Sequence, residues 1–410
     1  MLAGDRGEAA ALAMKILVEM AGISGAQRLI DVTGAHIDSC LFHGIAGLDF
    51  AERLAAAGGR VVVPTTLNVS SLDLIHPDLY RGSDEDRAHA RRLMDAYVAM
   101  GCRATWTCAP YQLRERPALG EHVAWAESNA IVFANSVLGA RTDRYGDFID
   151  ICAALTGRVP EAGLHLDANR RGTVLFDLTG VPGVLLDAEV LYPVLGHLVG
   201  GATTGTEIPV IDGLPHGASE DRLKALGAGA ASSGAVALFH AVGSTPEAPD
   251  RAAAFGGREP SRTISVTVED LKRARDQLSS IGVTEELGAV SIGTPHFSID
   301  EFAELISLLD GPVAPGIDLW VSTGRDVLAE VERRGWLADL EAAGARMVVD
   351  TCTYITPILE PKPGAVMTNS AKWAWYAPGN IGVDVVFGSL EECVRSAIEG
   401  RVWRDDALWG

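Results

Sequence analysis

The sequence has no uninterrupted apolar run approaching 18 residues, so it predicts no membrane-spanning helix. Residues 1–22 place acidic side chains before their apolar stretch and show no small-residue cleavage site after a basic segment, which argues against a secretory signal. The six cysteines are scattered along 410 residues, and this spacing argues against the disulfide framework of a small secreted domain. We therefore expect a cytoplasmic protein with reduced thiols.

Basic side chains are also scarce. Lysine and arginine number 34 against 54 acidic residues, giving a net charge of -20, which repels phosphate backbones and anionic lipid headgroups. We expect neither a nucleic acid nor a membrane as partner. An anionic substrate would have to be bound by a local cluster of basic and hydroxyl side chains, because the field of the whole protein opposes it.

The familiar catalytic motifs are missing as well. The chain contains no GxxxxGK[ST] phosphate loop, no HExxH, no paired CxxC and no GxSxG elbow. Aromatic residues make up only 6%, whereas 48% of residues are hydrophobic and glycine occurs 45 times. This composition excludes a disordered chain and is typical of α/β enzymes with many tight turns. At about 150 residues per domain, the length predicts two or three lobes.

From about residue 285 the pattern becomes a regular alternation of strand, polar turn and helix, which predicts a parallel sheet flanked by helices. Ligands are then expected at the carboxyl ends of its strands. We divide the chain into an N-terminal region, 1–283, with more than one lobe, and a C-terminal α/β lobe, 284–410. In the first region the pattern predicts a helix after Ser83, a strand over 103–107 and another over 130–135.

Two cysteines follow predicted strands, Cys108 in TWTCAPYQ and Cys352 in DTCTYI. Thiolates on separate loops can hold an iron–sulfur cluster with one iron open to substrate. The alternative is that each thiol is a small buried hydrophobe. Cys40 lies in GAHIDSCLFHG, where two histidines, an acid and a thiol indicate either a site or an ordinary loop.

Polar side chains suited to binding a carboxylate occur in two further blocks. VPTTLNVSSLD offers neutral donors, which turn capping explains equally well. GEHVAWAESNAIVFANSVLGARTDR inserts polar residues into an interior-looking stretch. Lys372 and Arg325 are candidates for pairing a substrate carboxylate, with surface salt bridges as the alternative.

Taken together, several segments resemble the large subunit of the aconitase X family: AHID, VPTTLN, TCAPYQ, GEHVAWAESNAIVFANSVLGARTDR, HLDANR, TPHFS, DTCTYI and TNSAKWAWYAP. The likeness runs nearly end to end. It implies an aconitase-like fold of several α/β/α lobes with mainly parallel sheets around a central cleft. It also implies an iron–sulfur cluster held by three cysteines and the dehydration of a small β-hydroxy acid.

The family includes cis-3-hydroxy-L-proline dehydratases and archaeal-type mevalonate 5-phosphate dehydratases. The archaeal pattern has a cysteine in GCPH, where this chain reads Gly293-Thr294-Pro295-His296. Because threonine cannot replace that thiolate, the resemblance implies Cys40, Cys108 and Cys352 as the metal ligands, with the number of irons open. The setting of Cys40 favours the hydroxyproline branch.

The resemblance also guides the assignment of roles and partners. The expected catalytic residues are His36, Asp38 and Lys372. The expected substrate-binding residues are Thr66, Asn68, Ser71, Glu127, Ser128, Asn135, Arg141, His296 and Ser370. A small swivelling subunit is expected to close over the cleft, and the catalytic base can lie on that partner.

Three alternatives stay open. A mevalonate 5-phosphate dehydratase would need a phosphate pocket with two or more basic residues. A zinc-dependent hydrolase would use His36, His43 and His240. A cluster-free, non-catalytic protein would bind the small subunit without turnover.

Overall fold

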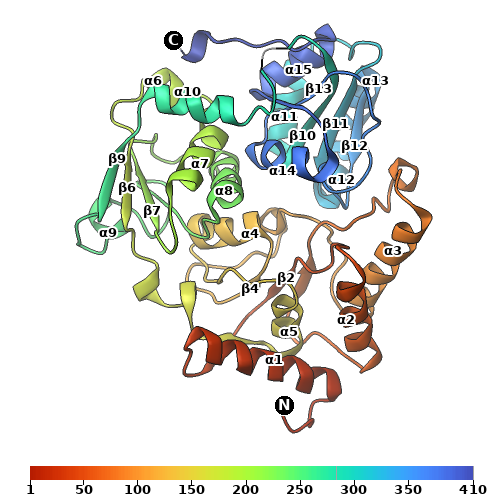
Figure 1. The fold of residues 1–410 in the computed structure, drawn as a ribbon, viewed down its shortest axis with the longest axis vertical. Coiled ribbons are helices and arrows are strands. Elements are labelled where there is room, and N and C mark those ends of the chain that lie inside the picture. Colours follow the sequence, from red (N-terminus) through yellow and green to blue (C-terminus); the bar gives the residue numbers. More distant parts are fainter. Residues whose placement is uncertain (283, 410) are drawn as a thin grey trace.

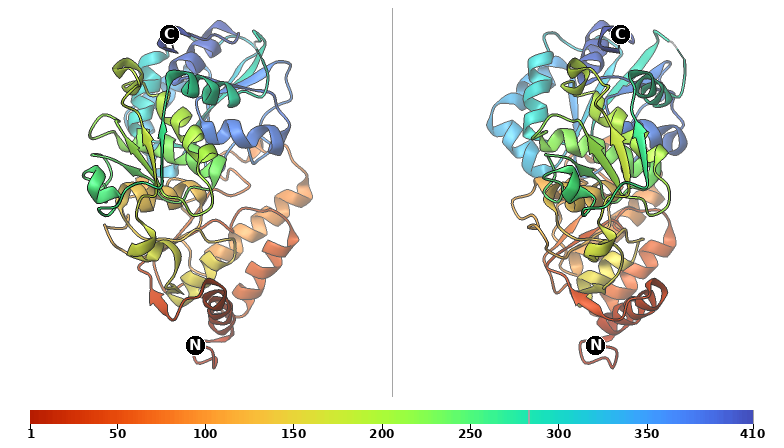
Figure 2. Two further views of the ribbon diagram at one scale, coloured as in Figure 1. Left: turned by 60° about the vertical axis from the view of Figure 1, so that its left-hand side comes forward. Right: turned by 90° about the vertical axis from the view of Figure 1, so that its left-hand side faces the viewer.

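The computed structural model describes residues 1–282 and 284–409, which form three lobes (Figure 1). We call them the N-terminal lobe (8–160), the middle lobe (174–277) and the C-terminal lobe (287–399). Figure 1 shows the middle and C-terminal lobes side by side, and in Figure 2 both lie above the N-terminal lobe. The boundary expected between 283 and 284 touches residue 283, which, like residue 410, lies outside the described residues.

The N-terminal lobe is built on a small parallel sheet with the strand order β3-β2-β4. The helix predicted after Ser83 is confirmed. The Ser83 hydroxyl caps its first turn by accepting a hydrogen bond from the Asp86 amide (3.0 Å). The elements are α1 (Glu8–Ser24), β1 (Leu29–Asp31), β2 (Ala35–Ile37), α2 (Ile45–Ala56), β3 (Thr65–Leu67), α3 (Asp84–Ala99), β4 (Ala124–Trp125), α4 (Ser128–Phe133), a π-helix (Ala134–Leu138), α5 (Ile149–Thr156) and β5 (Arg158–Pro160).

Two strand predictions in this lobe are wrong. The apolar run at 130–135 belongs to α4 and the start of the π-helix. A helix begins here because the Glu127 carboxylate caps it, accepting a hydrogen bond from the Ala130 amide (2.6 Å). A short apolar run in a sequence fits a buried helix as well as a buried strand. Residues 103–107 make only one bridge, between Arg103 and Thr66, and the positive φ of Trp106 (43°) interrupts an extended conformation.

The middle lobe has four parallel strands in the order β8-β7-β6-β9, packed against helices. Glycines on α7 and α8 let these two helices approach closely, since a Cβ on Gly196 would lie 2.1 Å from the Leu226 carbonyl oxygen. The elements are β6 (Val174–Asp177), α6 (Gly183–Leu186), α7 (Leu191–Ala202), β7 (Pro209–Asp212), α8 (Glu220–Gly234), β8 (His240–Ala241), α9 (Arg251–Ala254), β9 (Arg262–Ser265) and α10 (Val268–Gln277).

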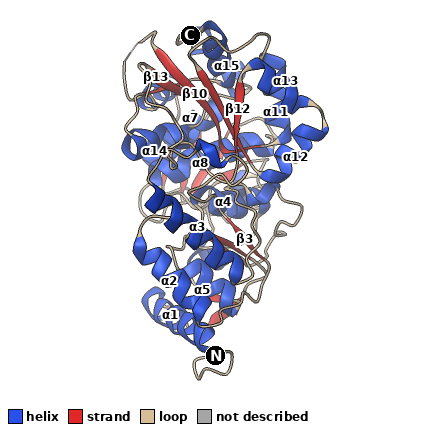
Figure 3. Cartoon of the chain, turned by 90° about the vertical axis from the view of Figure 1, so that its right-hand side faces the viewer, coloured by secondary structure: helices blue, strands red, loops and turns tan. Residues whose placement is uncertain are grey.

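The C-terminal lobe confirms the predicted alternation of strand and helix except after residues 345–348, where turns without a helix lead to the next strand. Its five parallel strands have the order β12-β11-β10-β13-β14, and in Figure 3 α11, α12 and α13 lie on one side of this sheet. The elements are β10 (Leu287–Phe297), α11 (Ile299–Leu308), β11 (Asp318–Thr323), α12 (Arg325–Arg333), α13 (Trp336–Ala343), β12 (Ala345–Val348), β13 (Ala365–Thr368), α14 (Ala371–Ile381), β14 (Val385–Phe387) and α15 (Leu390–Glu399).

The largest hydrophobic core spans the middle and C-terminal lobes, and it takes in Cys108 and Cys352. Helix α14 contacts both α8 and the C-terminal sheet, so it lies between the two lobes. A separate core fills the N-terminal lobe and contains Cys40. Among the described residues, no helix is long and apolar enough to cross a membrane.

Candidate metal and active site

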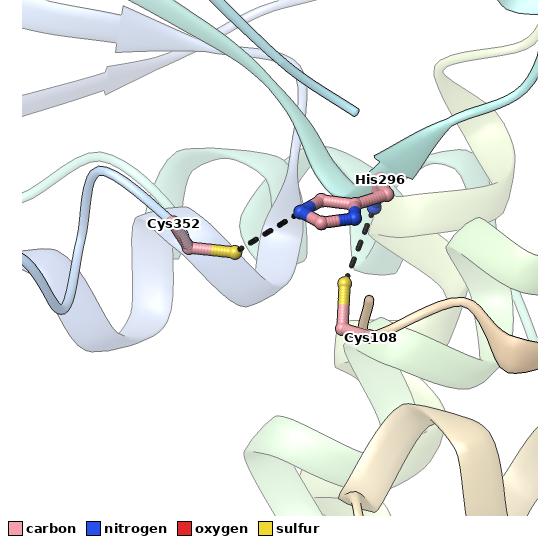
Figure 4. A group of neighbouring side chains, drawn as sticks. All are labelled: Cys108, His296 and Cys352. Atoms are coloured by element: carbon pink, nitrogen blue, oxygen red, sulfur yellow. Dashed lines mark hydrogen bonds between the residues drawn. The ribbon is translucent and has the colours of Figure 1, made fainter. Parts of the chain in front are cut away.

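Two thiols and an imidazole converge where the lobes meet. The possible ligand atoms of Cys108, His296 and Cys352 all lie within 4.8 Å of one another (Figure 4). Cys108 comes from the N-terminal lobe, and the other two come from the C-terminal lobe. All three side chains are buried, at 2%, 0% and 1% exposure. Within residues 1–282 and 284–409, no other group of three His, Cys, Asp or Glu side chains is this compact.

The backbone of β10 explains how His296 reaches this point. The pairing of β10 with β11 shifts register between Ile292 and Phe297, so the residues between them bulge from the regular ladder. Gly293 allows this close approach, because a Cβ there would lie 2.2 Å from the Ser322 carbonyl oxygen and its φ is +88°.

The imidazole of His296 is held on both edges. Its Nδ1 lies 3.0 Å from the Thr107 hydroxyl, and its Nε2 lies 3.3 Å from the Thr351 carbonyl oxygen and 3.9 Å from the Cys352 sulfur. Its backbone amide also donates to the Cys108 sulfur (3.3 Å). Burial lowers the pKa of His296 to about 4, so the ring is neutral at neutral pH, the form in which an imidazole can ligate a metal.

The two thiols shift each other's pKa. Burial raises the pKa of Cys108, but the contact with Cys352 lowers it below its ordinary value. The same contact, together with burial, raises the pKa of Cys352 well above its ordinary value. The positive charge of Lys372 further favours a thiolate. Two sulfurs and one neutral imidazole, shielded from solvent, are a donor set that suits iron or zinc and also an iron–sulfur cluster.

A buried ion pair lies beside these ligands. The Lys372 ammonium donates to the Glu127 carboxylate, and both side chains are about 5% exposed or less. Burial disfavours both charges, but their attraction outweighs it, so the pKa of Glu127 is lowered and that of Lys372 is raised. Both groups therefore stay charged at neutral pH. The Ser128 hydroxyl also donates to Glu127 (3.2 Å).

The predicted residues of the N-terminal sheet form a second polar group. His36 is fully buried on β2, and its Nδ1 lies 2.8 Å from the Thr66 hydroxyl. Burial lowers its pKa to about 4. The Asn68 amide donates to the Asp38 carboxylate, whose pKa burial and the charge of Glu127 raise to about 7. Asp38 thus titrates in the range that acid–base catalysis at neutral pH requires.

Several buried polar atoms in these segments have no partner in the protein. They include His36 Nε2, Asn68 Oδ1, Ser70 Oγ, Asn129 Oδ1 and Thr294 Oγ1. Buried polar groups are nearly always hydrogen-bonded, so these unpaired atoms are candidates for binding a ligand or water.

Cys40 is not part of the compact ligand group. Its thiol donates to the carbonyl oxygens of Ile37 and Asn68, both at 3.4 Å, inside the N-terminal core. The structure thus brings together two of the three expected ligand cysteines, and it places His296, expected to bind substrate, at the third corner.

Other predicted substrate-binding side chains have structural partners. Ser370 caps α14 (3.0 Å from the Trp373 amide), and Ser71 accepts a hydrogen bond from the Phe42 amide (3.0 Å). The Asn135 amide bonds to the carbonyls of Thr142 and Ala237, and its oxygen accepts from Arg170. Arg141 pairs with Asp167, and Arg325 pairs with Asp350. These contacts occupy the groups that would bind a substrate.

The histidines of the zinc hydrolase alternative are not brought together. The Nε2 of His240 donates to the Arg170 carbonyl oxygen (2.7 Å), and its Nδ1 has no partner in the protein. In the described part of the chain, the compact group that could hold a metal contains neither His36, His43 nor His240.

Two residues at the junction were not singled out from the sequence. Tyr354 is 6% exposed, and its phenol interacts electrostatically with Lys372. Lys224, from the middle lobe, lies 3.4 Å from the His296 carbonyl oxygen and pairs with Asp221 and Glu301. A lysine in the apolar pattern of α8 was the available signal for Lys224, whereas Tyr354 is visible only as a neighbour of Cys352 in DTCTYI.

The lobes and their junction define a multi-lobed α/β enzyme with a buried metal-ligating group. Family models described as the Aconitase X first, second and third domains match residues 1–168, 172–276 and 287–399. The chain is 48% identical over 98% of its length to a cis-3-hydroxy-L-proline dehydratase of Pseudomonas aeruginosa, and 41% identical over 97% to one of Hypocrea jecorina. It spans 69% and 67% of those two proteins.

More distant relatives and a solved structure agree. A phosphomevalonate dehydratase large subunit of Methanothermobacter thermautotrophicus is 37% identical, with 96% of both chains covered. The crystal structure of Thermococcus kodakaraensis aconitase X in its holo-form matches with a TM-score of 0.85 at 33% identity, covering 97% of both chains. The chain belongs to the aconitase X family. Its expected fold and its class, a dehydratase or hydro-lyase, are confirmed.

Proposed function

We propose that this chain is the large, catalytic part of a cis-3-hydroxy-L-proline dehydratase. The observation that carries the proposal is the 48% identity, over nearly the whole chain, to the Pseudomonas aeruginosa enzyme of that name. Identity to the phosphomevalonate dehydratase large subunits is lower, at 37% for the Methanothermobacter protein. The ligand-bearing segments and the Lys372–Glu127 pair supply the chemistry that a dehydratase of a β-hydroxy acid requires.

The charges at the junction also favour an unphosphorylated substrate. Lys372 pairs with Glu127, and Lys224 pairs with Asp221 and Glu301, so each buried lysine already has a carboxylate partner. A phosphate group needs two or more basic side chains free to bind it. Hydroxyproline is compact and has one carboxylate and one amine, so its binding requires fewer free basic side chains.

We further propose that Cys108 and Cys352 are thiolate ligands of an iron–sulfur cluster, with His296 as the third ligand in place of Cys40. When bound, such a cluster supplies a Lewis acid for the substrate hydroxyl. Cys40 would first have to give up its hydrogen bonds to two backbone carbonyls. Histidine ligands to iron–sulfur clusters are known chemistry.

The remaining steps fall to the side chains of this chain. Lys372, although paired with Glu127, would contribute positive charge at the junction and so stabilise the negative charge that develops when the α proton leaves. Asp38 would take that proton, with its carboxylate held by the hydrogen bond that Asn68 donates. Neutral His36, with its unpaired Nε2, can bind a polar group of the substrate. Burial of the ligand-bearing residues keeps bulk water from the reacting atoms.

We propose a partner as well, a small subunit or domain that closes over the junction. The chain aligns with about two thirds of each hydroxyproline dehydratase but with 96% of the Methanothermobacter large subunit. The remaining third of the longer relatives has to be supplied for full activity, by further chain or by a separate subunit.

The test is to express this chain anaerobically, alone and together with its candidate small partner, and to measure iron, sulfide and the visible spectrum. Both substrates are then assayed, with product formation followed for each. Turnover of cis-3-hydroxy-L-proline by an iron-containing pair supports the proposal. Turnover of mevalonate 5-phosphate but not of cis-3-hydroxy-L-proline would identify the phosphorylated compound as the substrate. A colourless, iron-free, inactive pair would contradict the proposal.

A pH profile tests the role of Asp38. A general base must be ionised, so with a pKa of about 7 we expect kcat/KM to rise about tenfold per pH unit below pH 7 and to level off above it. Asp38→Asn should abolish this rise and lower the plateau by about 10²- to 10⁴-fold. If the variant keeps the wild-type profile, the base lies on the partner and Asp38 only shapes the pocket.

A further inference from the structure

The turn that carries Cys352 contains a residue in an unusual backbone conformation. Asp350, two residues before Cys352, is fully buried and has a φ of +64°. Only a few per cent of residues other than glycine adopt this left-handed region, which costs free energy, although asparagine and aspartate do so more readily than most. Such a conformation persists only where the surroundings hold it in place, so the contacts of Asp350 indicate what fixes the turn.

The Asp350 carboxylate is engaged on two sides. Arg325, the first residue of α12, donates Nε and Nη2 to its two oxygens at 2.6 and 2.7 Å. The backbone amide of Leu74, from the N-terminal lobe, donates to Oδ2 at 3.1 Å. A two-pronged guanidinium pair fixes the orientation of a carboxylate as well as its charge. Asp350 therefore ties the turn both to its own lobe and to the neighbouring one.

Backbone contacts repeat the connection between the lobes. The amide of Ser70 donates to the Asp350 carbonyl oxygen (2.7 Å), and the amide of Val349 donates to the Asp73 carboxylate (2.9 Å). Asp73 is itself held by the amides of Ile75 and His76, at 2.8 and 2.7 Å. Residues 70–76 of the N-terminal lobe thus hold the Cys352 turn at several points.

The chain just before residues 70–76 holds the loop that carries Cys108. Residues 70–76 continue directly from β3, and the last residue of β3, Leu67, accepts a hydrogen bond from the Thr107 amide (3.1 Å). The Thr105 hydroxyl bonds to Leu67 on both sides, at 2.9 Å to its amide and to its carbonyl oxygen. One short segment of the N-terminal lobe therefore holds both cysteine-bearing loops.

We propose that Asp350 is a positioning residue that sets the separation of the Cys108 and Cys352 sulfurs by joining the Cys352 turn to the segment that holds Cys108. This inference rests on the proposed function in so far as the two thiols hold the cluster. Asp350 itself touches neither substrate nor metal. Residues that orient metal ligands typically change metal affinity by about 10- to 100-fold when they are replaced.

Two variants separate the carboxylate from the backbone conformation. Asp350→Gly keeps the left-handed φ without cost but removes the contacts to Arg325 and Leu74. Arg325→Gln removes the charged partner from the other side and leaves Asp350 in the chain. Glu52→Gln is the matched control, because it breaks an exposed two-pronged pair with Arg92 (2.8 and 2.7 Å). Thermal unfolding of each purified chain checks that it is folded.

Two readouts are compared, both on the full chain. The first is the rate at which a ferrous chelator removes iron from the anaerobically reconstituted protein, expected to rise about 10- to 100-fold in both Asp350→Gly and Arg325→Gln. The second is binding of phenylarsine oxide to the metal-free chain. Its arsenic forms two As–S bonds to paired thiols and releases water, so it reports on sulfur spacing without iron. We expect about tenfold weaker binding in both variants and none at this site in Cys352→Ser.

The outcomes separate the inference from the proposed function. A folded Asp350→Gly chain that loses iron at the wild-type rate and binds the arsenical as tightly as the wild type would overturn the inference. Arsenical binding that Cys352→Ser leaves unchanged would overturn it as well. If the wild-type chain binds the arsenical through Cys352 but retains no iron, the proposed cofactor fails. The arsenical series then decides the role of Asp350 by itself.

Discussion

Replacing Lys372 with methionine should lower kcat/KM by about 10²- to 10³-fold, the usual loss when a group that stabilises developing negative charge is removed. Lys372 is buried at the ligand group, and its charge reaches Cys108, Cys352 and Tyr354. Methionine fills a similar volume without an ammonium group. Steady-state kinetics with cis-3-hydroxy-L-proline measure the loss.

The same variant should also be less stable, and this effect must be separated from catalysis. Removing the lysine leaves the Glu127 carboxylate buried without its cation, which typically costs about 3–5 kcal/mol. Adding Glu127→Gln removes the unpaired charge, so the double variant should regain most of the stability and none of the activity. If the double variant regains activity as well, Lys372 only neutralises Glu127 and does not bind the substrate. Urea unfolding of the three chains provides the stability scale.

The C-terminal lobe was predictable from sequence because its strands are apolar runs, and all except β12 are followed by a polar turn and a helix. Serine caps with acids three residues later mark the starts of α11 and α15, at Ser298 and Ser389. The N-terminal lobe was less predictable. Its strands have only two or three residues, and the run at 130–135 gives no period that would tell helix from strand.

The site was predictable in part for a related reason. Cys352 and Lys372 come after strands of the C-terminal sheet, β12 and β13, and a position after a strand end is visible in sequence. Cys108 reaches the same junction although the strand expected before it does not form. The place of His296 depends on the register shift of β10, which the sequence marks only by Gly293. Asn135 is bound by Arg170, 35 residues further along the chain, and Arg141 pairs with Asp167, 26 residues further along. No local sequence pattern predicts either contact.

The largest effect is expected from the two converging cysteines. Cys108→Ser and Cys352→Ser should each lose the visible absorption and the iron of the reconstituted protein, and activity should fall below detection. A serine hydroxyl is a far weaker ligand for iron than a thiolate, because it stays protonated at neutral pH. Cys393→Ser is the matched control, since Cys393 is equally buried but lies on α15 in a separate core. It should keep iron and activity.

Cys40 and His296 then decide the third ligand. Cys40→Ser should keep its iron, because the new hydroxyl can still donate to the carbonyls of Ile37 and Asn68 that the thiol now contacts. His296→Ala should lose most of the iron, since it removes the imidazole and opens a cavity between Thr107 and Thr351. The reverse result, iron lost with Cys40→Ser and kept with His296→Ala, would show that the thiol of Cys40 moves into the junction when iron binds. The N-terminal sheet would then have to shift toward the C-terminal lobe on cluster assembly, because Cys40 follows β2 in the core of that sheet.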